Sequence, residues 1–193
     1  MAEAGRVIAG SARGLRLRAP GEGTRPIGDR VKQTLFAVLE AGTLGPWPAA
    51  FLDLFAGSGA CGIEALSRGA PRAVFVERER SAIAAIRANV HAAGFDDRST
   101  VVAGDVLGYL AGSPVRETFG AVVVDPPYGD ATLVGALERL AEPGAGWLSG
   151  EAVVVAKHFW RDLPPARVGR LERVRERRFG ETALSFYVAV PSA

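Results

Sequence analysis

The chain has 193 residues, 48% of them hydrophobic and 23% charged, and a formal net charge of +2 at pH 7. These values exclude a disordered, collagen-like or coiled-coil chain, and the length predicts one ordinary domain rather than a large multidomain enzyme. No apolar run approaches the roughly 18 to 20 residues of a membrane span, no secretory signal is visible and Cys61 is the sole cysteine, so we expect a cytoplasmic protein without membrane contact.

Residues 1–45 predict an N-terminal extension to the main domain. Residues 6–10 and 15–20 predict a small hairpin, and residues 24–42 predict an amphipathic helix. Residues 1–32 carry seven basic and three acidic side chains, an imbalance that indicates either a polyanion as partner or an ordinary solvated surface. The candidate contacts to a phosphate backbone in this extension, which would be RNA under the resemblance described below, are Arg6, Arg13, Arg16, Arg18, Arg25 and Arg30.

In residues 46–193, short apolar runs alternate with helical stretches, which is typical of a parallel sheet covered by helices on both faces. The predicted strands are residues 50–56, 73–77, 99–105, 120–127, 151–158, 175–181 and 183–190. The predicted helices are residues 62–70, 80–94, 106–112 and 131–144. No helix separates the last two strands, so they should form an antiparallel hairpin at the sheet edge. The predicted fold class is therefore a doubly wound, Rossmann-like α/β domain with a mostly parallel sheet.

The first candidate functional motif is FLDLFAGSGACGIEAL, in which a buried strand ends in a glycine-rich turn and a helix follows. Gly57, Gly59 and Gly62 satisfy GxGxxG, a spacing that brings backbone N–H groups near a ligand at a helix N-terminus. Glu77 ends the next strand, where an acidic side chain suits ribose hydroxyls. Together these residues predict an adenosine-type cofactor without choosing which, and a turn with no ligand is the alternative.

The second motif, VVVDPPYGD, places Asp125, Pro126, Pro127 and Tyr128 after the carboxyl end of a hydrophobic strand, where open α/β sheets bind ligands. A planar exocyclic amine must localise its lone pair before it attacks a methyl group. Acceptors from the Asp125 carboxylate and the Pro126 carbonyl would favour that state, and Tyr128 offers a face for stacking the target base. The motif favours methylation of an amino group over a turn that merely ends a strand.

With DLFAGSG as the cofactor turn and DPPY as the amino-methylating motif, the chain resembles class I S-adenosylmethionine-dependent methyltransferases. RVIAGSARGLRL and TRPIGDRVKQTLF narrow the resemblance to the bacterial 16S ribosomal RNA guanine-N2 methyltransferase family, over residues 6–190. The resemblance implies S-adenosylmethionine as cofactor, S-adenosylhomocysteine as product, and a guanine of the small ribosomal subunit as substrate. We expect a monomer without a metal, because two histidines and one cysteine form no metal-binding pattern.

The resemblance also assigns residues to the site. Glu77 would bind the ribose, Asp105 would reach the adenine edge, and Asp125 to Tyr128 would hold the guanine. The implied cofactor contacts are Asp53, Phe55, Ala56, Gly57, Gly59, Glu77, Arg78, Asp105, Val106 and Asp125. The chain departs from the family at residues 156–158, where an acidic residue is usual, so no role is assigned to Lys157 or His158.

Other functions remain open at this point. A DNA adenine or cytosine amino-methyltransferase shares the DPPY motif, although only about 45 residues lie outside the core to recognise DNA. A nicotinamide-dependent oxidoreductase and a non-catalytic RNA-binding module are the alternatives from other classes. Residues 161–178 carry a second basic excess, which either extends the RNA surface or forms an ordinary charged edge. Only Lys32 and Lys157 are lysines, a bias that we attribute in part to genome composition.

Overall fold

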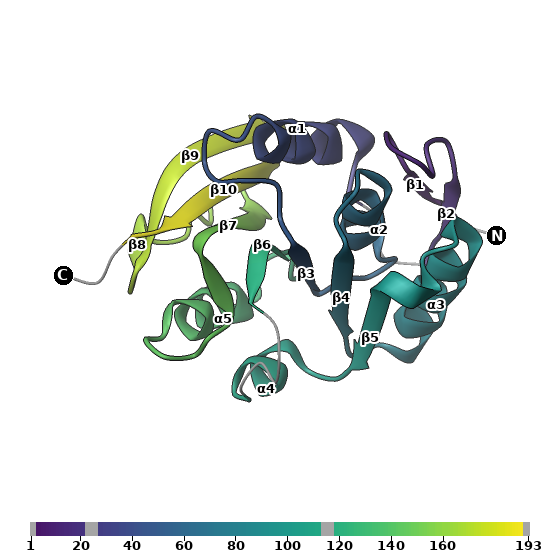
Figure 1. Ribbon diagram of the computed structural model, residues 1–193. Coiled ribbons are helices and arrows are strands. Elements are labelled where there is room, and N and C mark those ends of the chain that lie inside the picture. The colour runs from purple at the N-terminus through teal and green to yellow at the C-terminus, as the bar shows by residue number, and fades with distance from the viewer. Residues whose placement is uncertain (1–2, 22–26, 113–117, 191–193) are drawn as a thin grey trace.

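A computed structural model describes residues 3–21, 27–112 and 118–190. Within these ranges the chain forms a two-stranded hairpin and an eight-stranded sheet with helices around it (Figure 1). The strands are β1 (Glu3–Arg6), β2 (Arg16–Arg18), β3 (Ala50–Leu54), β4 (Arg72–Glu77), β5 (Ser99–Ala103), β6 (Phe119–Val124), β7 (Leu148–Phe159), β8 (Arg167–Val168), β9 (Leu171–Phe179) and β10 (Thr182–Ala189). The helices are α1 (Asp29–Glu40), α2 (Ala60–Ser67), α3 (Arg80–Ala93), α4 (Val106–Leu110) and α5 (Thr132–Ala141), with a 3-10 turn η1 (Asp96–Arg98).

The large sheet has the strand order β5-β4-β3-β6-β7-β10-β9-β8. Strands β3 to β7 are parallel to their neighbours among themselves, whereas β10 and β9 form the predicted antiparallel hairpin beside β7. The predicted fold class is confirmed. Leu54 at the end of β3 pairs with Val76 of β4 and Val124 of β6, so the glycine-rich turn, Glu77 and Asp125 follow adjacent strand ends. This register brings the two sequence motifs to one edge of the sheet.

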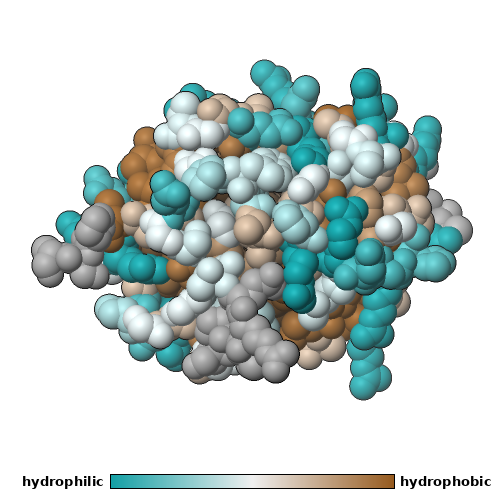
Figure 2. Space-filling model, viewed as in Figure 1, coloured by the Kyte–Doolittle hydropathy of each residue, from teal (hydrophilic) through white to brown (hydrophobic). Residues whose placement is uncertain are grey.

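Apolar side chains cover both faces of the sheet, and successive strand residues point to opposite faces. Phe51 packs in the cluster that holds α1, α2, α3 and the β1–β2 hairpin, while its neighbour Leu52 packs with α4 and α5. Burial on both sides explains the continuous apolar runs of the sequence. On the face shown in Figure 2, hydrophilic side chains are interspersed with hydrophobic ones. No helix among the described residues is long and apolar enough to cross a membrane.

The N-terminal hairpin forms, but its first strand lies earlier in the sequence than predicted. Strand β1 ends at Arg6, where the predicted strand began, because the backbone N–H groups of Ile8 and Ala9 donate to the Glu64 carboxylate at 2.8 and 3.0 Å. These bonds remove the segment from the strand ladder and attach it to α2. Helix α1 begins at Asp29 after an extended Gly28, later than predicted, and residues 24–26 lie outside the described residues.

The edge hairpin also extends further than the sequence indicated. Strand β9 begins at Leu171 and not at residue 175, and the short strand β8 was not predicted. Most residues of β9 between Leu171 and Phe179 are charged, and this polarity hides the strand from a search for apolar runs. The longer hairpin places the turn at Gly180 beside the end of β7, where Phe159 pairs with Thr182.

Candidate active site

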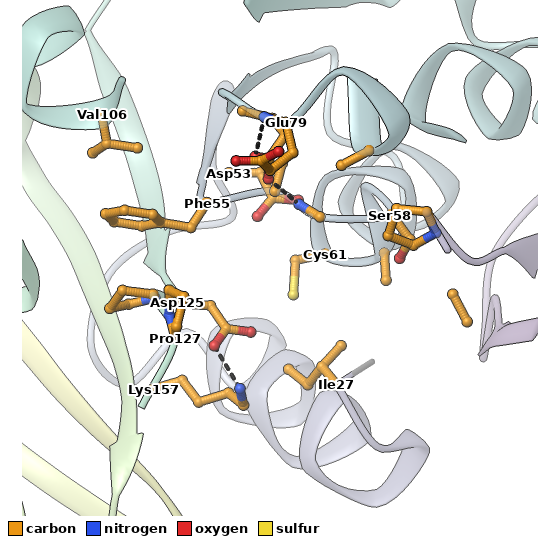
Figure 3. A pocket seen from close by; sticks show the side chains of 18 of the residues that line it. Ile27, Asp53, Phe55, Ser58, Cys61, Glu79, Val106, Asp125, Pro127 and Lys157 are labelled. Carbon is orange, nitrogen blue, oxygen red and sulfur yellow. Dashed lines mark hydrogen bonds and ion pairs between the residues drawn. The ribbon is translucent and has the colours of Figure 1, made fainter. Parts of the chain in front are cut away.

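A pocket of about 770 Å³ opens at the carboxyl ends of β3, β4 and β6 (Figure 3). Its lining includes the glycine-rich turn, Glu77, Asp105 and all four residues of the DPPY motif. The N-terminal extension supplies a further wall through Ala4, Ile27 and Val31, which also belong to the apolar cluster on that face of the sheet. The two motifs predicted separately from the sequence therefore share one pocket.

The turn after β3 is held in an unusual backbone conformation. Phe55 has φ of 60°, a left-handed value that is rare for an aromatic residue, and Gly57 and Gly59 follow at 55° and 77°. Gly62 has a different role from the one its motif suggests, because a Cβ there would lie 2.2 Å from the Phe75 ring. Its lack of a side chain allows α2 to pack closely on β4, while the strained backbone lies at the pocket, as it often does at functional sites.

Glu77 organises this turn through its carboxylate. It accepts hydrogen bonds from the backbone N–H groups of Gly57, Arg78 and Glu79 at 2.8, 2.8 and 2.9 Å. A carboxylate has about four acceptor sites, so capacity remains for a ligand hydroxyl. The Gly57 N–H is satisfied within the protein, which removes a donor that a dinucleotide pyrophosphate would need in this type of turn. Arg78 also lines the pocket, with its guanidinium 3.6 Å from the Glu79 carboxylate.

Asp53 lies beneath the turn, 2% exposed, and accepts a hydrogen bond from the Gly62 N–H at 2.8 Å. Burial raises its pKa to about 8. The Gly62 hydrogen bond opposes this rise, and the charges of Asp125 and Glu77 add to it. With a pKa of about 8, Asp53 is mostly protonated at neutral pH and adds little negative charge to the pocket, whose lining also includes the Glu77, Asp105 and Asp125 carboxyl groups.

The adenine side of the predicted site is built by the start of α4. Asp105 is the N-cap of that helix, and its carboxylate accepts from the Gly108 N–H at 2.8 Å. Val106 follows and is buried, and both residues line the pocket together with Phe55 and Ala56. Of the cofactor residues named from the sequence, all but Gly59 line this pocket, and Gly59 lies in the turn between the lining residues Ser58 and Ala60.

At the end of β6, the Asp125 carboxylate forms an ion pair with Lys157 of β7, with Nζ and Oδ1 2.5 Å apart. Figure 3 shows the two side chains pointing toward one another at the pocket. Burial raises the pKa of Asp125, and the positive charge of Lys157 opposes that rise. Lys157 is the pocket residue to which the sequence assigned no role, since its ion-pair partner lies 32 positions away. Its rarity in an arginine-rich chain was the available signal.

Tyr128 extends the motif toward solvent with 40% of its surface exposed. Its hydroxyl hydrogen-bonds the Thr182 hydroxyl of β10 at 2.5 Å, and the Lys157 ammonium lies 5.0 Å from its ring centroid. Pro126 is buried and Pro127 exposed, so the two prolines connect the strand end to the surface. The ring is fixed at its tip while part of its surface stays accessible to a planar ligand.

The arginines of the extension lie on its surface. The side chains of Arg6, Arg13, Arg16, Arg18 and Arg30 are exposed, whereas Arg25 lies outside the described residues. Arg6 forms an ion pair with Asp29 at 3.3 Å. Their exposure leaves the predicted RNA contact as a prediction.

The cysteine and the two histidines of the chain have no role in the predicted site. Cys61 is buried under the turn, where burial raises the pKa of its thiol, and His158 is buried against the Ser185 hydroxyl at 3.0 Å. His91 is exposed beside Asp96. Among the described residues, no group of three histidine, cysteine, aspartate or glutamate side chains is placed to hold a metal ion.

Comparison with known proteins relates this geometry to a family. The family model described as conserved hypothetical protein 95 matches residues 5–188. The chain is 36% identical to YlbH of Bacillus subtilis over 186 residues, which cover 94% of this chain and 97% of YlbH. It is 34% identical to ribosomal RNA small subunit methyltransferase D of Escherichia coli K12 over 185 residues, 94% and 88% of the two chains. The solved structure of yhhF from Escherichia coli superposes with a TM-score of 0.79 at 33% identity, over 95% and 97% of the chains.

Proposed function

The chain belongs to the conserved hypothetical protein 95 family and is an S-adenosylmethionine-dependent methyltransferase, and from that premise we propose that it methylates the exocyclic N2 of a guanine in 16S ribosomal RNA. The observation that carries this proposal is the shared pocket, in which Asp125 and Tyr128 face the same space as the glycine-rich turn. One wall is suited to the cofactor and the other to a planar amine.

The residues at the glycine-rich turn fit S-adenosylmethionine. When bound, this cofactor supplies a methyl group that is already activated on a sulfonium cation. Glu77 retains acceptor capacity for ribose hydroxyls, and Asp105 lies where the adenine edge would bind. The Glu77, Asp105 and Asp125 carboxyl groups that line the pocket favour a cation. Phe55 and Val106 provide the apolar surface on which an adenine ring would pack.

The residues at the end of β6 fit the acceptor amine. The Asp125 carboxylate would accept the N–H groups of the exocyclic nitrogen and stabilise the pyramidal geometry that forms as the nitrogen attacks. Lys157 holds that carboxylate in place through the ion pair and favours its charged form. Tyr128 would stack on the target base, which must leave its own stack to enter the pocket. After transfer, the proton of the methylated nitrogen can pass to Asp125 or to water.

The alternatives are weakened by particular features. A nicotinamide dinucleotide would place pyrophosphate charge beside Glu77, and the Gly57 N–H that it needs is already bonded. A DNA amino-methyltransferase would use the same amine chemistry, so the target nucleic acid must be identified by experiment. A non-catalytic RNA-binding module has no need of the Asp125–Lys157 pair at the pocket.

We propose that the extension contacts RNA through the arginines named from the sequence. Those that the structure describes have exposed side chains. Its apolar residues fix it to the core beside the pocket, so RNA bound there would lie next to the site of methylation. The small ribosomal subunit is the expected partner.

The proposal is tested by incubating the protein and labelled S-adenosylmethionine with small ribosomal subunits that lack the modification, then identifying the product nucleoside. We expect N2-methylguanosine in 16S ribosomal RNA. Methylation of DNA or of an adenine would contradict the proposal. Thermal stabilisation by S-adenosylhomocysteine but not by nicotinamide dinucleotides is the matching binding result.

A further inference from the structure

A second hollow, of about 330 Å³, adjoins the active-site pocket. The two share the DPPY residues Pro126, Pro127 and Tyr128, and they also share Lys157. The second hollow continues along Phe159 at the end of β7 and the segment that follows it, residues 162–165. The chemistry proposed above assigns no function to this space.

The lining of this hollow exposes apolar surface that a folded chain normally covers. Tyr128, Leu163 and Val174 are the large apolar residues that stay exposed among the described part of the chain, and the first two line the hollow at 40% and 48% exposure. Apolar surface gathered beside an active site is typical of a binding surface. Of the acidic residues in the lining, Asp130 already accepts the Thr132 N–H at 2.9 Å, and Asp162 is exposed at the rim.

A row of aromatic rings runs from the active site past this hollow. The Tyr128 and Phe159 ring centroids lie 6.1 Å apart, and those of Phe159 and Trp160 lie 6.2 Å apart. The planes of neighbouring rings are tilted by 53° and 51°. These centroid distances and tilts are typical of aromatic rings in contact. Stacking on such rings binds nucleic acid bases without regard to their sequence.

Two arginines flank the outer end of the row. The Arg178 guanidinium carbon lies 3.6 Å from the Trp160 ring centroid, and that of Arg161 lies 4.9 Å from it. Arg178 donates from Nε to the Gly180 carbonyl at 2.9 Å, and neither guanidinium forms an ion pair with a described residue. A guanidinium stacked on a ring keeps its outer N–H edge free for a phosphate. Aromatic rings beside unpaired cations indicate a nucleotide as the ligand.

Given the function proposed above, on which this inference rests, we propose that the second hollow binds the nucleotide adjacent to the target guanine. Its base lies against Phe159 and Leu163, and its phosphate is bound beside the hollow by Arg161 and Arg178, which lie against Trp160. When the target base leaves its stack, the neighbouring base loses a stacking partner, and the hollow compensates for that loss. The segment that follows β7, together with Arg178 of β9, thus recognises RNA beside the DPPY motif.

The base contact is tested with two small-subunit RNA fragments that differ in one residue, the nucleotide next to the target guanine being either intact or abasic. Affinity is measured by fluorescence anisotropy with S-adenosylhomocysteine present. The wild-type protein should bind the abasic RNA roughly 5- to 150-fold more weakly, the range expected for one stacked base. Phe159→Ala should bind both RNAs with similar, weakened affinity, because the partner of that base is gone.

The phosphate contact is tested with the double variant Arg161→Ala/Arg178→Ala. Its RNA affinity should fall less steeply with salt, with a slope reduced by up to about 0.7 for each lost contact. Arg167→Ala is the matched control, because Arg167 also donates from Nε to a carbonyl two positions on, at 3.3 Å, but it has no ring beneath it. The control should leave RNA affinity and its salt slope unchanged.

The outcomes separate this inference from the function on which it rests. If the wild-type protein methylates small-subunit RNA while the abasic residue and the double variant change binding no more than Arg167→Ala does, the hollow has no nucleotide ligand. If the wild-type protein methylates no RNA, the proposed function itself is wrong and this inference falls with it. Binding of S-adenosylhomocysteine should be the same in all variants, which shows that each is folded.

Discussion

The chain has two lysines, and each forms an ion pair with a carboxylate, yet the two pairs differ in their surroundings. Lys32 and Glu64 are 1% and 0% exposed, with Nζ and Oε2 3.3 Å apart. Lys157 and Asp125 are 12% and 21% exposed and lie at the pocket. In both places a lysine reaches across from an element that is distant in sequence, but only the second pair faces a space that a ligand can occupy.

In the Lys32–Glu64 pair, both charged groups form further hydrogen bonds within the protein. The Lys32 ammonium donates to the Arg6 carbonyl at 2.5 Å, while Glu64 accepts two backbone N–H groups of the extension and the Arg68 guanidinium at 2.7 Å. Such a pair fixes the N-terminal extension to α2. The Asp125 carboxylate has one protein partner, Lys157, among the described residues, and so keeps acceptor capacity for a substrate. The Lys32–Glu64 pair is thus saturated with protein partners and supports the fold. The Asp125–Lys157 pair is unsaturated and can act on a ligand.

The largest effect should follow from breaking the saturated pair. Lys32→Met leaves the Glu64 charge buried with less compensation, which costs about 3–5 kcal/mol for buried pairs in general. Chemical denaturation should therefore show a large loss in the free energy of unfolding. Lys157→Met, measured in the same way, is the control and should lose less because its pair is partly exposed. Equal losses in the two variants would refute the distinction between the pairs.

The next effect concerns catalysis rather than stability. Asp125→Ala should reduce the rate of methyl transfer by roughly 10² to 10³, by analogy with the loss of one group that stabilises developing charge in a transition state. Affinity for S-adenosylhomocysteine, measured by calorimetry, should change little, because this carboxylate acts on the acceptor amine. Near-normal methylation by the variant would remove the DPPY motif from the chemistry.

These two pairs also show how far the sequence could predict the structure. Local patterns predicted the sheet, the glycine-rich turn and the position of Asp125, because apolar periodicity and turn residues are encoded within a few positions. Both lysine pairs join residues about 32 positions apart, and that spacing carries no periodic signal. The shifted β1 strand has the same origin, since Glu64 of α2 captures the N–H groups that would have extended the hairpin. Long-range polar contacts were therefore what the sequence left undetermined.

A smaller catalytic effect is expected from the lysine of the unsaturated pair. Lys157→Met removes a hydrogen bond to a charged group, worth about 1.5–3 kcal/mol, and should lower kcat/KM by roughly 10- to 150-fold at neutral pH. Burial already raises the pKa of Asp125, and loss of the opposing positive charge raises it further. Since the ionised carboxylate is the active form, activity is lost as pH falls through this pKa, and the acid limb of the pH profile should move to higher pH in the variant.

Lys157→Arg distinguishes a charge effect from a packing effect. Arginine keeps the positive charge beside Asp125, so the acid limb should return toward its wild-type position even if the rate is only partly restored. A pH profile that is unchanged in Lys157→Met would show that Lys157 supports the shape of the pocket and does not tune the Asp125 carboxylate.

The smallest effect on stability should come from breaking the exposed Arg6–Asp29 ion pair of the N-terminal extension. This substitution tests whether the Arg6 charge contributes to stability or to RNA binding. The Arg6 and Asp29 side chains are 65% and 42% exposed, so Arg6→Ala should change the free energy of unfolding by less than about 1 kcal/mol. The lysine partner of this residue is unaffected, because Lys32 binds the Arg6 backbone carbonyl. Arg139→Ala, which removes a comparably exposed pair with Glu142, should have the same small effect on stability.

The two variants should differ in RNA binding: if Arg6 contacts a phosphate, its variant lowers the salt slope of RNA affinity by about 0.7 to 0.9, whereas the Arg139 variant does not. Identical affinities and slopes would show that the Arg6 side chain is solvated. The Lys32–Glu64 pair would still hold the extension on α2, and any RNA contact of the extension would then have to come from its other arginines.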